Sequence, residues 1–106
     1  MSLQQLRENL EKGFYLDNLY EMARLCKSLA LDTTSPAPFF FMAHIFLDIA
    51  RQWEDKPLVV EEAKVVESKI TKPLEELIEG IATNASSEEI FTLLNRVVSA
   101  YLVSFM

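Results

Sequence analysis

The chain has 106 residues, of which 50% are hydrophobic and 25% are charged, and its formal net charge is −6. This balance is typical of one globular domain and argues against a disordered chain. Because Lys and Arg are outnumbered and scattered, the charge also argues against binding to nucleic acid or to an anionic membrane surface.

The first two apolar stripes indicate two helices that are separated at Gly13. Leu3, Leu6 and Leu10 share one helix face, whereas the apolar residues after Gly13 would lie on nearly the opposite face of a continuous helix. A phase jump at a glycine predicts that a helix ends there, with Gly13 in the left-handed conformation. We therefore predict helices over about 2–12 and 14–31. The predicted core face of the second comprises Tyr15, Leu16, Leu19, Met22, Ala23, Cys26, Leu29 and Ala30.

A third helix is predicted over about 36–54, after a polar connector. Ser35 fits an N-cap, and Pro36 fits the first helical position, where a proline loses no hydrogen bond. The apolar arc of this helix is wide, which is typical of a helix that is contacted on more than one side. Trp53 is assigned to the core. The polar side carries His44, Asp48, Arg51 and Gln52.

Three consecutive phenylalanines near the start of this helix cannot all face the core. The helical period points Phe39 inward, places Phe40 at the edge of the apolar arc, and places Phe41 on the polar side. Two explanations stay open. Either Phe41 is buried by the first helix or by the connector, or Phe40 and Phe41 belong to an exposed patch that another subunit or partner covers.

The stretch 57–82 contains Pro73 within a helical pattern. It has a stripe of Val59, Ala63, Val66 and Ile70, which Leu74, Leu77 and Ile81 continue after the proline without loss of phase. Preserved phase favours one helix kinked near Pro73 over two separate helices.

The last helix is predicted to begin near Ser86, which resembles a capping box with Glu89. Short connections make consecutive helices antiparallel neighbours, so we predict an all-α, up-and-down helical bundle of four main helices plus a short N-terminal helix, in a single domain over 1–106. The predicted core face of the last helix is Ile90, Phe91, Leu94, Val97, Val98, Tyr101 and Phe105, and its solvent face is Thr92, Asn95, Arg96 and Ser99.

Groups that carry catalysis are sparse. His44 is the only histidine, so one chain cannot build a multi-histidine zinc site. Phe41 occupies the place of the glutamate that a di-iron bundle needs three residues before its histidine. We interpret His44, Asp48 and Arg51 as a solvent-facing stripe, and Cys26 as a buried, inert thiol. The prediction is no catalytic, cofactor-binding or metal-binding residue, with the clustered glutamates facing solvent.

We expect a non-catalytic protein-interaction module, such as a small adaptor, regulator or assembly factor, that acts through helix faces and forms a homodimer or binds another protein. The single cysteine and an N-terminus unlike a signal peptide favour the cytoplasm, and no stretch is apolar enough to cross a membrane. The alternative is an enzymatic or small-ligand-binding bundle with a pocket between helices, lined by Phe, Trp and Met, with His44 or a carboxylate as its polar group. Candidate interface residues are Phe40, Phe41, His44, Asp48, Leu58, Val65 and Val103.

Overall fold

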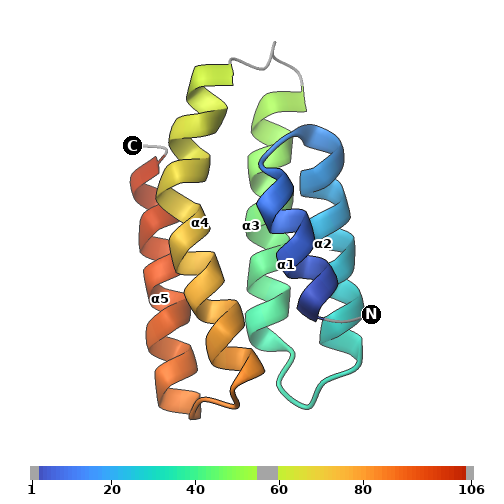
Figure 1. Ribbon diagram of the computed structural model, residues 1–106, viewed down its shortest axis with the longest axis vertical. Helices are drawn as coiled ribbons and strands as arrows, with labels where there is room; N and C mark the ends of the chain where they lie inside the picture. The colour runs from blue at the N-terminus through green and yellow to red at the C-terminus, as the bar shows by residue number, and fades with distance from the viewer. Residues whose placement is uncertain (1–2, 55–59, 105–106) are drawn as a thin grey trace. The chain divides into compact units, whose positions relative to one another are not determined.

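The computed structural model describes residues 3–54 and 60–104, and all of the regular structure in these ranges is α-helical (Figure 1). The predicted all-α class is therefore confirmed. The chain divides into two compact units, Met1–Val60 and Glu61–Met106. The single domain over 1–106 stays a prediction. The helices are α1 (Leu3–Lys12), α2 (Leu16–Leu31), α3 (Ala37–Glu54), α4 (Val60–Ala82) and α5 (Ser87–Ser104).

In the first unit, α2 and α3 form an antiparallel pair and α1 packs against α2 (Figure 1). The predicted break at Gly13 is confirmed, because Gly13 has a φ of 95°. Its N–H donates to the carbonyl oxygen of Leu10 at 3.2 Å, which closes the last turn of α1. Only glycine adopts this left-handed conformation without steric cost, so the break between the helices is encoded locally.

A buried asparagine that the sequence analysis did not single out ties α1 to α2. Asn18 is only 3% exposed. Its Nδ2 donates to the carbonyl oxygens of Asn9 and Gly13, both at 2.7 Å. These carbonyls lie at the C-terminal end of α1, where backbone acceptors lack partners within the helix. One amide group therefore satisfies two of them and fixes the end of α1 against the start of α2.

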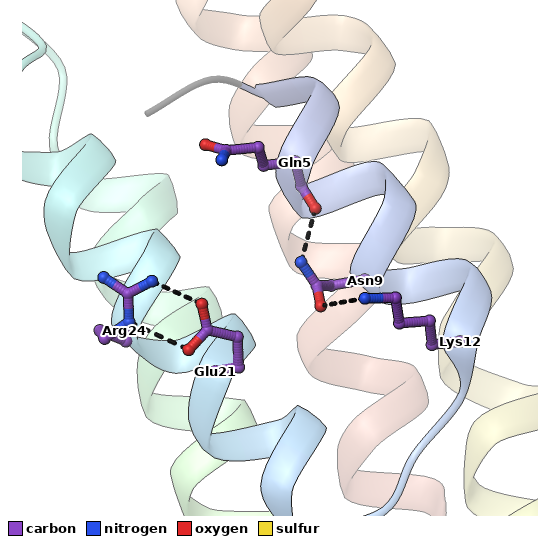
Figure 2. Close-up of polar contacts among 5 residues, drawn as sticks. All are labelled: Gln5, Asn9, Lys12, Glu21 and Arg24. Atoms are coloured by element: carbon purple, nitrogen blue, oxygen red, sulfur yellow. Dashed lines mark hydrogen bonds and ion pairs between the residues drawn. The ribbon is translucent and has the colours of Figure 1, made fainter.

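The side chain of Asn9 makes separate contacts on the surface of α1 (Figure 2). Its Nδ2 donates to the carbonyl oxygen of Gln5 at 2.8 Å, and its Oδ1 accepts from Lys12 Nζ at 3.5 Å. Both contacts are exposed, so they add little to stability in comparison with the buried bonds of Asn18.

The apolar stripes of α2 and α3 are buried largely as predicted, with one correction at Tyr15. Tyr15 is the N-cap residue of α2 and has extended backbone angles, so its side chain leaves the helical stripe and is exposed. Phe14 is buried instead, and its ring meets Phe46 edge-to-face with centroids 6.2 Å apart. The buried apolar residues of α2 and α3 are Leu19, Met22, Ala23, Leu25, Cys26, Leu29, Phe39, Met42, Ala43, Ile45, Phe46, Ile49, Ala50 and Trp53.

Helix α3 begins one residue later than predicted. The Phe40 N–H donates to the carbonyl oxygen of Pro36 at 3.0 Å, so Pro36 takes the N-cap position that was assigned to Ser35. Pro38 falls in the first turn, where a missing N–H costs no helical hydrogen bond.

In the second unit, α4 runs without interruption through Pro73, which confirms one helix in place of two. Helix α5 follows antiparallel to α4 after a tight turn at Asn84, whose φ is 56° (Figure 1). Ser86 Oγ accepts from the Glu89 N–H at 3.2 Å, as the predicted cap requires. The stripe of Val66, Ile70, Leu74 and Leu77 is buried. The predicted members Val59 and Ala63 lie outside the residues whose side chains are described.

Of the predicted core face of α5, Val97 is buried, Ile90, Leu94, Val98 and Tyr101 are half-buried, and Phe105 lies outside the described residues. Gly80 on α4 leaves room for the neighbouring Leu93. A Cβ placed on Gly80 would lie 2.6 Å from Leu93 Cδ1 and 3.4 Å from Ile90 Cδ1. The missing side chain therefore lets α5 approach α4 through Leu93. Val97 becomes the centre of the buried face, whereas Phe91, which was predicted to be in the core, is exposed. The predicted solvent face is confirmed, since Thr92, Asn95, Arg96 and Ser99 are all exposed.

We expect Asn18→Ala to lower the free energy of unfolding by about 1–3 kcal/mol, because two backbone acceptors lose their donor in a buried site. Urea denaturation measures this loss. Asn9→Ala is the matched control, since it removes only the exposed contacts to Gln5 and Lys12 and leaves the Asn9 carbonyl in place. Equal losses in the two variants would contradict the assignment of Asn18 as the tie between α1 and α2.

Candidate functional site

The candidate site lies on the solvent side of α3. Nine of the 18 residues of this helix are buried, and they occupy one continuous arc of its surface. The remaining arc presents two phenylalanines together with polar side chains. The name α3 face is used for Phe40, Phe41, His44 and Asp48. The first three are exposed and Asp48 is half-buried.

Phe39, Phe40 and Phe41 take the three directions that the helical period predicts. Phe39 is buried, whereas Phe40 is 63% and Phe41 is 47% exposed. The explanation in which Phe41 is buried within the monomer is therefore wrong. The two exposed rings meet edge-to-face, with centroids 6.4 Å apart and an angle of 83° between their planes. This contact holds both rings against each other in a geometry that aromatic pairs favour, so the patch has a defined shape.

His44 lies on the helix surface between the directions of Phe40 and Phe41, because it follows them by four and three residues. It is exposed, and no hydrogen bond or ion pair joins it to Asp48 or Arg51 in the described parts of the chain. Asp48 instead accepts a long hydrogen bond from Gln52 Nε2 at 3.4 Å. The spacing thus aligns these side chains along one face without forming an acid–base pair.

The other candidate interface residues do not belong to the α3 face. Val65 on α4 and Val103 on α5 are exposed, as expected from their places off the core stripes, and both belong to the second unit. Leu58 lies outside the described residues. The structure therefore brings Phe40, Phe41, His44 and Asp48 together on one helix and places the remaining residues elsewhere.

On α5 the sequence analysis assigned Phe91 to the core and did not single out Leu102, and both side chains are exposed. The signal was present in the sequence, because Leu93 and Ala100 give α5 a second apolar stripe on the other flank of Val97. Two stripes leave the rotation of a helix ambiguous until its neighbour is known. Gly80 on α4 resolves the ambiguity in favour of the Leu93 side.

One ion pair in each unit is solvent-exposed. Arg24 Nε donates to Glu21 Oε2 at 3.0 Å on α2 (Figure 2). This hydrogen bond holds the pKa of Glu21 below its ordinary value and raises the pKa of Arg24. Arg96 on α5 approaches Glu76 on α4 at 3.6 Å. Exposed pairs of this kind contribute little to stability.

An open depression of about 480 Å³ lies beside the start of α5 and contains neither His44, Cys26 nor an aromatic side chain. It does not match the aromatic pocket of the alternative hypothesis. Its lining consists of Ser86, Glu88, Glu89, Thr92, Leu93 and Arg96.

In the described ranges, no group of three or more His, Cys, Asp or Glu side chains is placed to hold a metal ion. Among the helices of those ranges, none combines the length and the apolar character that crossing a membrane requires.

Neither a family model, nor a curated protein, nor a solved structure matches the chain. The candidate site therefore rests on the geometry of α3, in which two adjacent aromatic rings are exposed on a helix whose other face is buried.

Cys26 lies in the buried face of α2, and burial raises the pKa of its thiol to about 12. Because only the thiolate reacts, we expect labelling by an aromatic disulfide at pH 8 to be roughly a thousandfold slower in the folded protein than in denaturant. Stopped-flow absorbance measures both rates. Equal rates would show that Cys26 is accessible and that the buried assignment is wrong.

The raised pKa of Cys26 also makes the stability of the folded protein decrease at high pH. The pKa of Cys26 in the folded protein lies above the value of about 8.5 for an unfolded cysteine. The contribution of Cys26 to stability is therefore complete below pH 8.5 and is lost as pH rises towards the folded pKa of about 12. We expect the urea midpoint of the wild type, measured relative to that of Cys26→Ala, to decrease as the pH is raised from 8 to 10.

Proposed function

We propose that this protein is a non-catalytic interaction module that acts through the α3 face and associates with a second copy of itself. The observation that supports the proposal is the pair of exposed, mutually contacting rings of Phe40 and Phe41. Exposed aromatic clusters mark interaction surfaces, because interface cores are enriched in aromatic residues and depleted of charge. A symmetric dimer is the commonest way for a small protein to cover such a surface.

The size of the patch sets the strength of the proposed contact. Covering the exposed parts of both rings removes on the order of 200 Å² per copy from water. At about 25 cal/mol per Å², two copies gain roughly 10 kcal/mol, against an association cost of about 4–15 kcal/mol. At the low end of that cost the balance is about −6 kcal/mol, which corresponds to a dissociation constant of tens of micromolar. The expected dimer is therefore weak and depends on concentration.

The charges of the α3 face are compatible with a two-fold contact. An antiparallel approach of two α3 helices brings the start of one face against the end of the other. Phe40 of one copy then meets Arg51 of the second, where a guanidinium lies favourably on a ring. Asp48 approaches the Phe41 end of the second copy and lies one helical turn from Arg51, which supplies the opposite charge.

The proposal includes a cytoplasmic location. Its support is the single, buried Cys26, which suits a reducing compartment.

We expect the wild-type chain to have an average mass above 12.1 kDa at tens of micromolar, and Phe41→Asp to lower that mass. The variant places a carboxylate in the proposed contact twice, once from each copy. Light scattering measures the masses, and circular dichroism checks that the fold is retained.

Tyr15→Asp is the matched control, because Tyr15 is 45% exposed, close to the 47% of Phe41. Aspartate is also a favoured N-cap at that position, so the control should fold. Its mass should equal that of the wild type. A wild-type mass of 12.1 kDa, or equal masses for the wild type and Phe41→Asp, would overturn the α3 contact.

A further inference from the structure

His44 is the only histidine of the chain, and it occupies the middle of the α3 face. Its side chain is exposed, with Phe40 one turn before it and Asp48 one turn after it along the helix. Imidazole is the side-chain group that ordinarily changes its charge between pH 5 and pH 8, above the range in which carboxylates are protonated. The α3 face can therefore gain a positive charge near neutral pH.

The charged neighbours of His44 on its own helix are Asp48 and Arg51, about one and two turns further along α3. Asp48 accepts the long hydrogen bond from Gln52 Nε2 at 3.4 Å and is not joined to His44. Because a carboxylate accepts more than one hydrogen bond, Asp48 can receive a second donor. The single chain leaves this donor to be supplied from outside.

The other element that packs against α3 in the first unit is α2. The Tyr20 hydroxyl donates to Glu54 Oε2 at 3.1 Å, so the start of α2 lies at the end of α3 and the second half of α2 runs beside the first half of α3. The charged residues in that half and at the cap that follows it are Arg24, Lys27 and Asp32, all exposed. Arg24 is already paired with Glu21. Within the described residues 3–54, no hydrogen bond or ion pair joins any of these groups to His44.

We infer, on the basis of the proposed α3 contact, that protonation of His44 strengthens the self-association by pairing His44 with Asp48 of the second copy. In an antiparallel two-fold contact with its axis near residue 46, a residue two positions before the axis lies opposite the residue two positions after it. His44 and Asp48 are also only about 40° apart around the helix, so both point across the contact. Symmetry makes the pair occur twice. The same axis places Phe40 opposite Arg51 of the second copy.

Two effects of the proton act in the same direction. Each protonated His44 faces a carboxylate of the second copy, and each proton also reduces the net charge of −6 that keeps the copies apart. Arg51 of the second copy lies about one turn further from His44, so its repulsion is weaker. Contacts that His44 makes within its own chain are present in monomer and dimer alike and do not enter the dissociation constant. Exposed ion pairs are individually weak, so two of them should lower the dissociation constant by roughly fivefold.

The test measures the dissociation constant of the full-length chain by sedimentation equilibrium at pH 8.0 and pH 5.5. The wild type should associate roughly fivefold more tightly at pH 5.5. His44→Gln should lose this response, and Asp48→Asn should lose most of it. Glu8→Gln is the matched control, since it removes an exposed carboxylate on α1, outside the α3 face, and it should keep the wild-type response.

A mixture separates pairing between copies from pairing within one chain. A dimer of one His44→Gln chain and one Asp48→Asn chain retains one His44–Asp48 pair between copies and has none within a chain. The average mass of an equimolar mixture should therefore exceed the mean of the two variants by more at pH 5.5 than at pH 8.0. An excess that is the same at both pH values would overturn the pairing between copies.

The outcomes for the wild type distinguish this inference from the α3 contact on which it rests. If the wild type associates equally at both pH values, or if Asp48→Asn keeps the full response, the His44–Asp48 pair is overturned while the α3 contact stands. If the wild type stays at 12.1 kDa at both pH values, the α3 contact itself falls and the pair falls with it. Circular dichroism of every variant at both pH values excludes unfolding as the cause.

Discussion

Successive side chains on an α-helix point in directions about 100° apart, and this constraint governs the surfaces on which the proposed function rests. Three adjacent phenylalanines at the start of α3 cannot share one buried face. Once Phe39 enters the core, Phe40 and Phe41 must point to the two flanks of the solvent side. Their exposure is thus a consequence of the helical period together with the burial of Phe39. Exposed aromatic rings lower the solubility of a protein. This is the physical reason to expect a partner that covers Phe40 and Phe41.

The rotation of each helix decides which of its side chains remain exposed, and contacts between neighbouring helices fix that rotation. Between α1 and α2 the contact is polar: the Asn18 amide bridges the Asn9 and Gly13 carbonyls and holds the two helices in one register. On α4 and α5 it is steric, because Gly80 leaves room for Leu93 and turns Phe91 outward. A larger residue at Gly80 would require α5 to shift, and the composition of its solvent face would change.

The sequence was informative about helix limits and less so about helix rotation. Gly13, Pro36 and Ser86 mark boundaries through backbone chemistry that acts within one turn, so the breaks were predictable to within about two residues. The continuity of α4 through Pro73 followed from preserved phase. Asn18 was missed because its partners are backbone carbonyls, which no side-chain pattern reveals. Phe91 was misplaced because α5 has two apolar stripes, and only its neighbour selects between them. The exposure of Phe40 and Phe41 was left open for a similar reason, since the sequence does not say which segment covers a flank.

The acidic excess of the chain and its apolar α3 face belong to one physical balance. Charge of one sign keeps copies apart in solution, and apolar surface brings them together over short distances. Both effects act at the α3 face, which keeps one carboxylate, that of Asp48, beside Arg51. Pairing at α3 therefore depends on apolar packing and on where Arg51 places its charge. Salt should accordingly act on the α3 contact in two opposite ways, because screening weakens the repulsion between copies of net charge −6 and also weakens the charge pairing at Arg51.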